Sequence, residues 1–153
     1  MRNLEELEID RGQFERNGEA VDTSVFEAHF QLDLSSEFRH FLKNTSGGYP
    51  WVGIFRKDDE EYGIGNLFYL TTHPEPESLY LNPMRDNLWD KNPDFQTAMR
   101  NNKVVVFAEG GANAFFIDYT EGEKIYFREL ATQKIIFLCD GFGYFIDSLE
   151  YVD

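Results

Sequence analysis

Apolar residues recur with a helical period near the front of the chain. Four of them are spaced at i, i+4, i+7 and i+8, which places them on one face of a helix in and just before residues 36–44. They are Leu34, Phe38, Phe41 and Leu42. Ser35 or Ser36 can cap the N-terminus, and Gly47-Gly48 can end the helix because glycine accepts a left-handed backbone. The pattern predicts a short amphipathic helix with a buried apolar face.

The residues ahead of this helix carry a weaker signal. Apolar positions in residues 1–21 are widely spaced and glycines interrupt them, so we expect a loosely structured lead-in. A short helix is predicted over residues 24–30, with Thr23 or Ser24 as its cap.

Two runs of strand-forming residues follow the front helix. Residues 51–55 and 65–70 lie on either side of the acidic stretch 57–61, and we expect them to pair as a hairpin. Consecutive side chains on extended backbone point in alternate directions, so these acids are typical of a solvated hairpin tip and not of a calcium loop.

The interval 71–102 is the least regular part of the sequence and contains four of the five prolines. Asn82-Pro83 and Asn92-Pro93 each match a cap followed by proline at the first helical position, which predicts short helices at 84–89 and 94–99. Irregular surface segments often carry binding residues, so this insert is a candidate contact region.

The last third repeats strand-forming runs about every ten residues. The four runs are 104–108, 114–119, 124–128 and 134–138. Gly110-Gly111 supplies the turn residues between the first two, because glycine accepts the positive φ of a tight turn. The spacing predicts a four-strand antiparallel meander.

A closing helix is predicted after the meander, with Asp140 as its cap. Its apolar face consists of Phe142, Phe145, Ile146, Leu149 and Val152. Short helices packed on one face of a largely antiparallel sheet make an α+β fold. A chain of 153 residues has the length of one ordinary domain, so we expect a single domain over 1–153.

These segments together resemble the SUKH superfamily. The matching positions are Leu34, Phe38, Phe41, Leu42, Gly47 and Gly48, then Phe107, Ala108, Gly110, Gly111, Asn113, Phe116 and Asp118, and finally Phe142, Phe145 and Leu149. Ser35 stands where proline is common in the family, and Thr45-Ser46 precedes the Gly-Gly where asparagine is usual. The superfamily includes fungal Smi/Knr-type cell-wall regulators and bacterial immunity proteins. The resemblance therefore implies a protein-binding domain, with no catalytic site.

The charge of the chain narrows the class of partner. Acidic residues number 28 against 14 basic ones, giving a net charge of -14. Such a surface repels a phosphate backbone, so direct nucleic-acid binding is disfavoured. An acidic surface is ordinarily a solvated one, but it also attracts a basic partner and speeds association. With the family resemblance, the charge points to a basic toxin domain.

Motifs that would indicate catalysis or a metal are incomplete or missing in the sequence. Glu37 and His40 match one step of a carboxylate-bridged metal site, but the second step and the further glutamates are missing, so no metal or cofactor is expected. The single cysteine, Cys139, lies in an apolar run and is interpreted as a small buried residue. Nucleophile-elbow and phosphate-loop motifs are absent, so we expect a protein without enzymatic activity.

The sequence also lacks the signals of a membrane or secreted protein. No apolar run approaches the roughly 20 residues of a membrane helix. The first residues have no signal-peptide core, so a cytoplasmic location is expected.

Candidate partner-binding residues are of two kinds. Acidic ones that would steer a basic partner are Asp58, Asp59, Glu60, Glu61, Glu75 and Glu77. Trp51 and Trp89 border irregular segments, where core packing is the favoured interpretation and an interface anchor the alternative. The leading hypothesis is a binding domain that neutralises a bacterial toxin by docking an acidic face on it. A regulatory scaffold of the Smi/Knr type and a small hydrolase are the alternatives.

Overall fold

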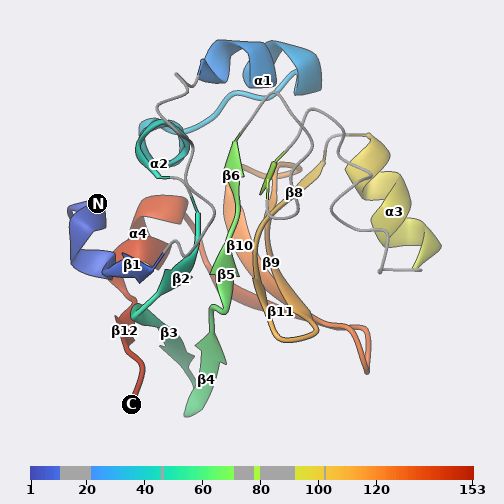
Figure 1. Cartoon of the computed structure of the whole chain (residues 1–153). Coiled ribbons are helices and arrows are strands. Elements are labelled where there is room, and N and C mark those ends of the chain that lie inside the picture. Colours follow the sequence, from blue (N-terminus) through green and yellow to red (C-terminus); the bar gives the residue numbers. More distant parts are fainter. Residues whose placement is uncertain (11–21, 46, 71–77, 80–91, 102) are drawn as a thin grey trace.

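A five-stranded antiparallel sheet forms the centre of the fold (Figure 1). The computed structural model describes residues 1–10, 22–45, 47–70, 78–79, 92–101 and 103–153. In spatial order the strands are β11 (Lys134–Cys139), β10 (Lys124–Glu129), β9 (Asn113–Asp118), β8 (Val104–Gly110) and β5 (Asn66–Leu67). The predicted four-strand meander is confirmed as β8–β11, and the fold is mixed α+β as expected.

The turn between β8 and β9 depends on two glycines for different reasons. Gly110 pairs with Asn113, and Gly111 has a φ of +64°, which glycine adopts at no steric cost. Gly110 lies against a neighbouring strand: a Cβ there would sit 2.1 Å from the carbonyl oxygen of Gly63. The motif predicted as a turn is therefore also a point of close backbone approach.

Helices cover both faces of this sheet. α2 (Ser36–Asn44) and α4 (Phe142–Asp147) pack on one face, where the sequence predicts all of the helices, so the prediction of a single covered face holds for these two and not for α3. α3 (Pro93–Arg100) lies against the other face, and its position confirms the predicted helix at 94–99 (Figure 1). α1 (Thr23–Phe30) lies beyond α2, at the top of the view. The other predicted short helix, at 84–89, falls outside the described residues.

The caps of these helices agree with the prediction in two cases of four. The Asn92 side chain accepts a hydrogen bond from the Phe95 N–H at 3.0 Å, which confirms the predicted cap ahead of Pro93 in α3. The Ser35 side chain accepts a hydrogen bond from the Phe38 N–H at 3.1 Å, which confirms the cap of α2. α1 is capped by Asp22, which accepts from the Ser24 N–H, so the prediction of Thr23 or Ser24 is wrong by one or two residues. Gly141 occupies the cap position of α4 without a side-chain bond, and the prediction of Asp140 is also wrong.

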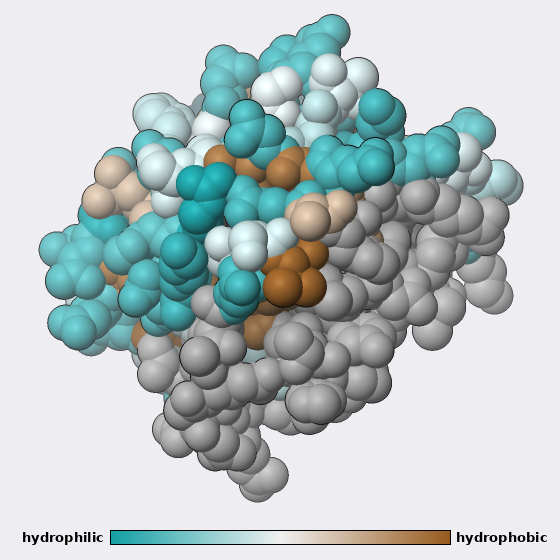
Figure 2. Space-filling view, turned by 90° about the horizontal axis from the view of Figure 1, so that it is seen from above, coloured by the Kyte–Doolittle hydropathy of each residue, from teal (hydrophilic) through white to brown (hydrophobic). Residues whose placement is uncertain are grey.

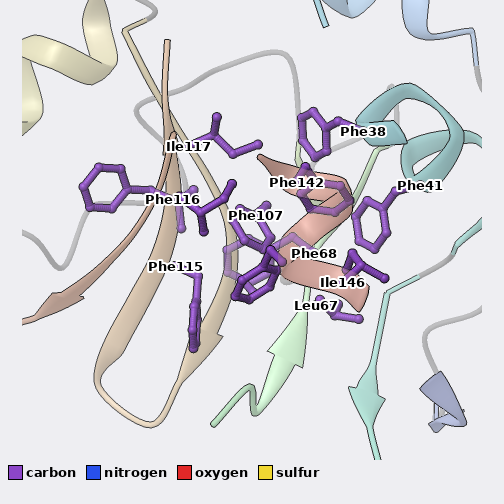
Figure 3. Close-up of a cluster of buried hydrophobic side chains, with 14 of the residues drawn as sticks. Phe38, Phe41, Leu67, Phe68, Phe107, Phe115, Phe116, Ile117, Phe142 and Ile146 are labelled. Carbon is purple, nitrogen blue, oxygen red and sulfur yellow. The ribbon is translucent and has the colours of Figure 1, made fainter. Parts of the chain in front are cut away.

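Aromatic rings fill the space between the sheet and α2 and α4 (Figure 3). The Phe107 ring, from β8, lies 5.3 Å from Phe142 and 5.5 Å from Phe145. Phe116, the residue after Phe115 in β9, points to the opposite side of the sheet in Figure 3. There its ring meets Phe95 of α3 at 5.2 Å. The sheet is therefore buried on both faces, with the larger aromatic cluster under α2 and α4.

The predicted hairpin between 51–55 and 65–70 is wrong. β3 (Val52–Lys57) pairs instead with β4 (Glu60–Gly63), across a two-residue turn. The chain then crosses to the large sheet, where β5 pairs with β8. β6 (Tyr69–Leu70) pairs with β7 (Ser78–Leu79). The crossing buries Leu67 completely, and removing this apolar side chain from water favours the pairing of β5 with β8.

Residues 1–10 also differ from the expected loose lead-in. A 3₁₀ helix, η1 (Leu4–Leu7), buries Leu7 fully, and β1 (Ile9–Asp10) pairs with β2 (Tyr49–Pro50). At the other end, β12 (Glu150–Tyr151) pairs with β3, so the small sheet has the order β12–β3–β4. A segment near the N-terminus therefore pairs with β2, and a segment near the C-terminus pairs with β3.

We predict that Phe145→Ala and Phe116→Ala each lower the free energy of unfolding by about 3–5 kcal/mol, because each removes a buried ring. Both side chains are at most 3% exposed. Urea titration followed by fluorescence measures the loss. Tyr144→Ala is the matched control in α4, since its side chain is 65% exposed and surface changes cost about 0.5 kcal/mol or less. A loss below about 1 kcal/mol at either phenylalanine would contradict its place in the core.

Candidate partner-binding surface

Four of the sequence-predicted acids, Asp58, Asp59, Glu60 and Glu61, lie at the end of the β3–β4 hairpin, at the bottom of Figure 1. Lys57 pairs with Glu60, and Asp58 and Asp59 between them have φ values of 52° and 64°. Two positive φ values are typical of the type I′ turn, whose twist matches that of the flanking strands. Aspartate tolerates this conformation better than most residues but still at a cost. The segment from Asp58 to Glu61 is called the acidic hairpin below.

One arginine neutralises part of the negative charge around this hairpin. The Arg56 guanidinium forms ion pairs with Glu61, Glu150 and Asp153. The hydrogen bonds that the guanidinium donates to Glu150 and then to Glu61 raise the pKa of Arg56 further above its ordinary value. Glu61 is therefore a structural partner of Arg56. Within the part of the chain that the structure describes, no ion pair engages Asp58, Asp59 or Glu60. These three carboxylates give the hairpin its net negative end.

Lys57 fastens the hairpin to the large sheet. Its Nζ donates a hydrogen bond to the Phe137 carbonyl oxygen at 2.5 Å and lies 4.7 Å from the centroid of the Phe137 ring. An ammonium over an aromatic face gains a cation–π attraction in addition to the hydrogen bond. The acidic hairpin is thus held beside β11 and does not project freely into solvent.

Trp51 lies at the other end of β3 and is 50% exposed, so the core-packing interpretation is wrong for this residue. Its N–H donates to the Glu8 carbonyl, and its carbonyl accepts from the Val152 N–H. The Tyr49 ring contacts the indole edge-on at 5.2 Å. Trp51 is therefore an exposed aromatic residue on a fixed backbone, the type of residue that anchors interfaces.

A second aromatic side chain extends this end of β3. Tyr151 of β12 is 61% exposed, and a hydrogen bond with the Glu8 carboxylate raises the pKa of its hydroxyl. The six residues of β3 separate this aromatic end from Asp58 by about 20 Å of strand. The structure thus brings the predicted acids together but leaves Trp51 at the opposite end of the same strand. Glu75, Glu77 and Trp89 lie outside the described residues.

A second acidic region, which the sequence did not indicate, lines a groove of about 690 Å³ beside α2 and α4. Its carboxylates are those of Asp33, Glu37, Glu123 and Asp140. The Glu123 carboxylate accepts a hydrogen bond from the Ser35 N–H at 2.8 Å, so it supports the start of α2. These acids are 107 residues apart in sequence (from 33 to 140), and spacing alone could not have grouped them. The face drawn in Figure 2 is likewise mostly hydrophilic, with only small apolar patches among the described residues.

The side chains in the described part offer little for catalysis. Burial raises the pKa of the Cys139 thiol to about 11, so at neutral pH it is a protonated, poorly nucleophilic group. His, Cys, Asp and Glu residues in the described ranges form no group of three that could hold a metal ion. Nor does any described helix have the length and apolar character needed to cross a membrane.

Comparison with known proteins decides the family. The model of the SMI1/KNR4 family (SUKH-1) matches residues 19–148, which is most of the chain. The chain belongs to the SMI1/KNR4 (SUKH-1) family. The resemblance found in the glycine-flanked motifs is thereby confirmed. This SUKH-1 protein matches no curated protein and no solved structure. The family includes immunity proteins and is generally non-catalytic.

We predict that Asp58→Asn with Asp59→Gly raises the free energy of unfolding of this SUKH-1 protein by about 0.5–1 kcal/mol. Asn-Gly is the preferred pair for a turn with two positive φ values, so the variant relieves the strain of the acidic turn. Urea titration of the variant beside the unaltered chain measures the gain. Asp58→Val with Asp59→Val, with β-branched residues at both positions, should instead destabilise. A loss of stability in the Asn-Gly variant would show that the aspartates make a structural contribution of their own.

Proposed function

We propose that this SUKH-1 protein is a non-enzymatic immunity protein that neutralises a basic toxin domain by docking an acidic surface on it. The observation that carries the proposal is the acidic hairpin, in a chain of net charge -14. Three of its carboxylates, those of Asp58, Asp59 and Glu60, form no ion pair with any residue that the structure describes. Family membership supports the class of function, because immunity proteins occur in this family.

The acids and the aromatic residues would contribute to different steps of binding. Exposed carboxylates such as Asp58 and Asp59 attract a basic partner over a distance and raise the association rate. An exposed aromatic residue such as Trp51 loses its contact with water only in the complex, so it slows dissociation. Both groups sit on backbone that is already fixed, which reduces the entropy lost on binding.

The experiment that tests the function is co-expression with a candidate toxin gene, sought in the neighbourhood of this gene or by pull-down. We expect the toxin domain to arrest growth of a bacterial host when expressed alone and this protein to restore growth. Because inhibition is by binding, the two purified proteins should also form a stable complex. Growth arrest that persists despite normal levels of this protein would refute immunity. The regulatory scaffold would then become the better hypothesis, since it needs a partner but no neutralised activity.

With the cognate toxin domain in hand, we predict that Asp58→Asn with Asp59→Asn lowers the association rate about threefold to tenfold at low salt, with little change in the dissociation rate. The difference should shrink as salt rises, because exposed charges are screened over about 8 Å at physiological ionic strength. Stopped-flow fluorescence at several salt concentrations gives both rates.

The matched control for this prediction removes two charges elsewhere. Glu5→Gln with Asp33→Asn changes the net charge by the same amount, at η1 and at the link between α1 and α2. Equal effects of the two double variants would mean that net charge alone steers the partner, and the acidic hairpin would lose its role. Association that does not depend on salt would refute the electrostatic part altogether.

Trp51→Ala should change the dissociation rate rather than the association rate. If the indole is an anchor, its removal raises the dissociation rate about 30-fold or more, equivalent to about 2 kcal/mol. Surface plasmon resonance with the toxin domain immobilised measures it. Tyr144→Ala removes another exposed ring, from α4, and should leave the dissociation rate within about twofold. Similar effects of both substitutions would contradict the assignment of Trp51.

A further inference from the structure

β11 forms one edge of the five-stranded sheet, and among the described residues its outer side pairs with no strand. Two alternate side chains of this strand are large, apolar and exposed: Ile135 at 49% and Phe137 at 36%. Exposed strand edges with apolar side chains recruit further strands unless something blocks them. An exposed apolar strand edge of this kind is therefore a candidate site for pairing with another strand.

The backbone of β11 also presents hydrogen-bonding groups outward. The Phe137 carbonyl oxygen accepts from Lys57 Nζ, which approaches from outside the sheet. In an antiparallel strand the N–H and C=O of one residue point to the same side, and the side alternates from residue to residue. Phe137 and Ile135 therefore both direct their peptide groups away from β10. Four backbone groups, the N–H and C=O of Ile135 and of Phe137, therefore face outward. Lys57 bonds to one of them, the Phe137 carbonyl oxygen.

A hollow of about 450 Å³ lies next to this edge, between the sheet and α3. Its apolar lining includes Phe95, Tyr126 and Ile135. Side chains of a strand paired with β11 would alternate between the two faces of the sheet, so every second one would point toward this hollow. The edge and the hollow together have the two elements of strand addition, main-chain hydrogen bonds and a side-chain pocket.

We propose that the outer edge of β11 is the docking site for an extended segment of a basic partner protein, which adds to the sheet as a sixth strand and places an apolar side chain in the hollow. The proposal rests on the proposed function only for the charge of the partner. A second copy of this chain is a poorer occupant, because each copy carries a net charge of -14. Two copies paired through β11 would also bring together the acids that flank it, Asp140 and the acidic hairpin.

Lys57 partly blocks this edge against pairing with another strand. Its ammonium and stem cover the carbonyl and ring of Phe137, which is how natural sheets limit unwanted pairing. An incoming strand can pair at Ile135 first and then displace Lys57 from Phe137. Removing the ammonium should therefore make the edge more receptive.

The probe is a blocked hexapeptide of alternating valine and lysine, added to the ¹⁵N-labelled full chain. We expect the amide signals of Ile135 and Phe137 to shift and their hydrogen exchange to slow by about tenfold at saturation. The control peptide carries N-methyl groups on the alternate amides that would pair, so it keeps charge and apolar content but cannot form the ladder. Equal shifts with both peptides, or shifts confined to other edges such as β4 or β5, would overturn the proposal.

Variants of the protein sharpen the result. Ile135→Lys should weaken peptide binding about tenfold, whereas Val25→Lys, at a position that is 48% exposed on α1, should not change it. Lys57→Met should tighten peptide binding about threefold or more, because methionine has no ammonium group to occupy the Phe137 carbonyl oxygen. No loss with Ile135→Lys, or a dimer of the chain that Ile135→Lys dissociates in sedimentation analysis, would reject the basic strand as the occupant. Failure here would leave the co-expression result untouched, so the two proposals fail separately.

Discussion

The packing of one phenylalanine between the sheet and two helices is the contact on which the fold depends. A bulge between Val106 and Ala108 leaves Phe107 without a partner in β9 and directs its ring toward α2 and α4. Rings from β9, α2 and α4 surround it at centroid distances of 5.3–6.5 Å: Phe38, Phe115, Phe142 and Phe145. Each well-oriented ring pair adds about 0.5–1.5 kcal/mol to the free energy gained by burial. Phe107 is therefore one residue of the sheet whose ring contacts both α2 and α4.

The small sheet that carries the acidic hairpin is mounted on the same cluster. Phe55 of β3 stacks on Phe145 at 5.3 Å, and Tyr62 of β4 meets Phe127 of β10 at 5.0 Å. Lys57 adds the third attachment, at the edge of β11. The base of the hairpin is thus part of the core, and its acids are held in place by ring packing together with the contacts of Lys57. A binding surface prepared in this way loses little conformational entropy when a partner docks.

The sequence predicted the elements whose signals are local and missed those set by distant parts of the chain. The period of α2 and the spacing of β8–β11 are visible in short windows, because each follows from which side of one element is buried. The pairing of β3 with β4 and the order of the small sheet depend on contacts with β8 and with both termini, which no window contains. The site shows the same division. Acids at the end of a hairpin were predicted, but the neutralisation of Glu61 by Arg56 depends on a network that includes Glu150, 94 residues from Arg56.

The extent of the surface determines how the acidic hairpin, β11 and Trp51 can work together. A stable interface covers about 800 Å² on each partner, which corresponds to a patch roughly 28 Å across. Three carboxylates at a hairpin tip cover only a small part of that area. Lys57 joins the hairpin to β11, so the charge that we propose to steer a partner lies beside the strand edge that we propose to bind it. Trp51 lies about 20 Å away along β3, at the limit of the same patch. Arg56 lies between Trp51 and Lys57 in β3, so a basic partner that covered both ends of this strand would compete with Arg56 for Glu150 and Asp153.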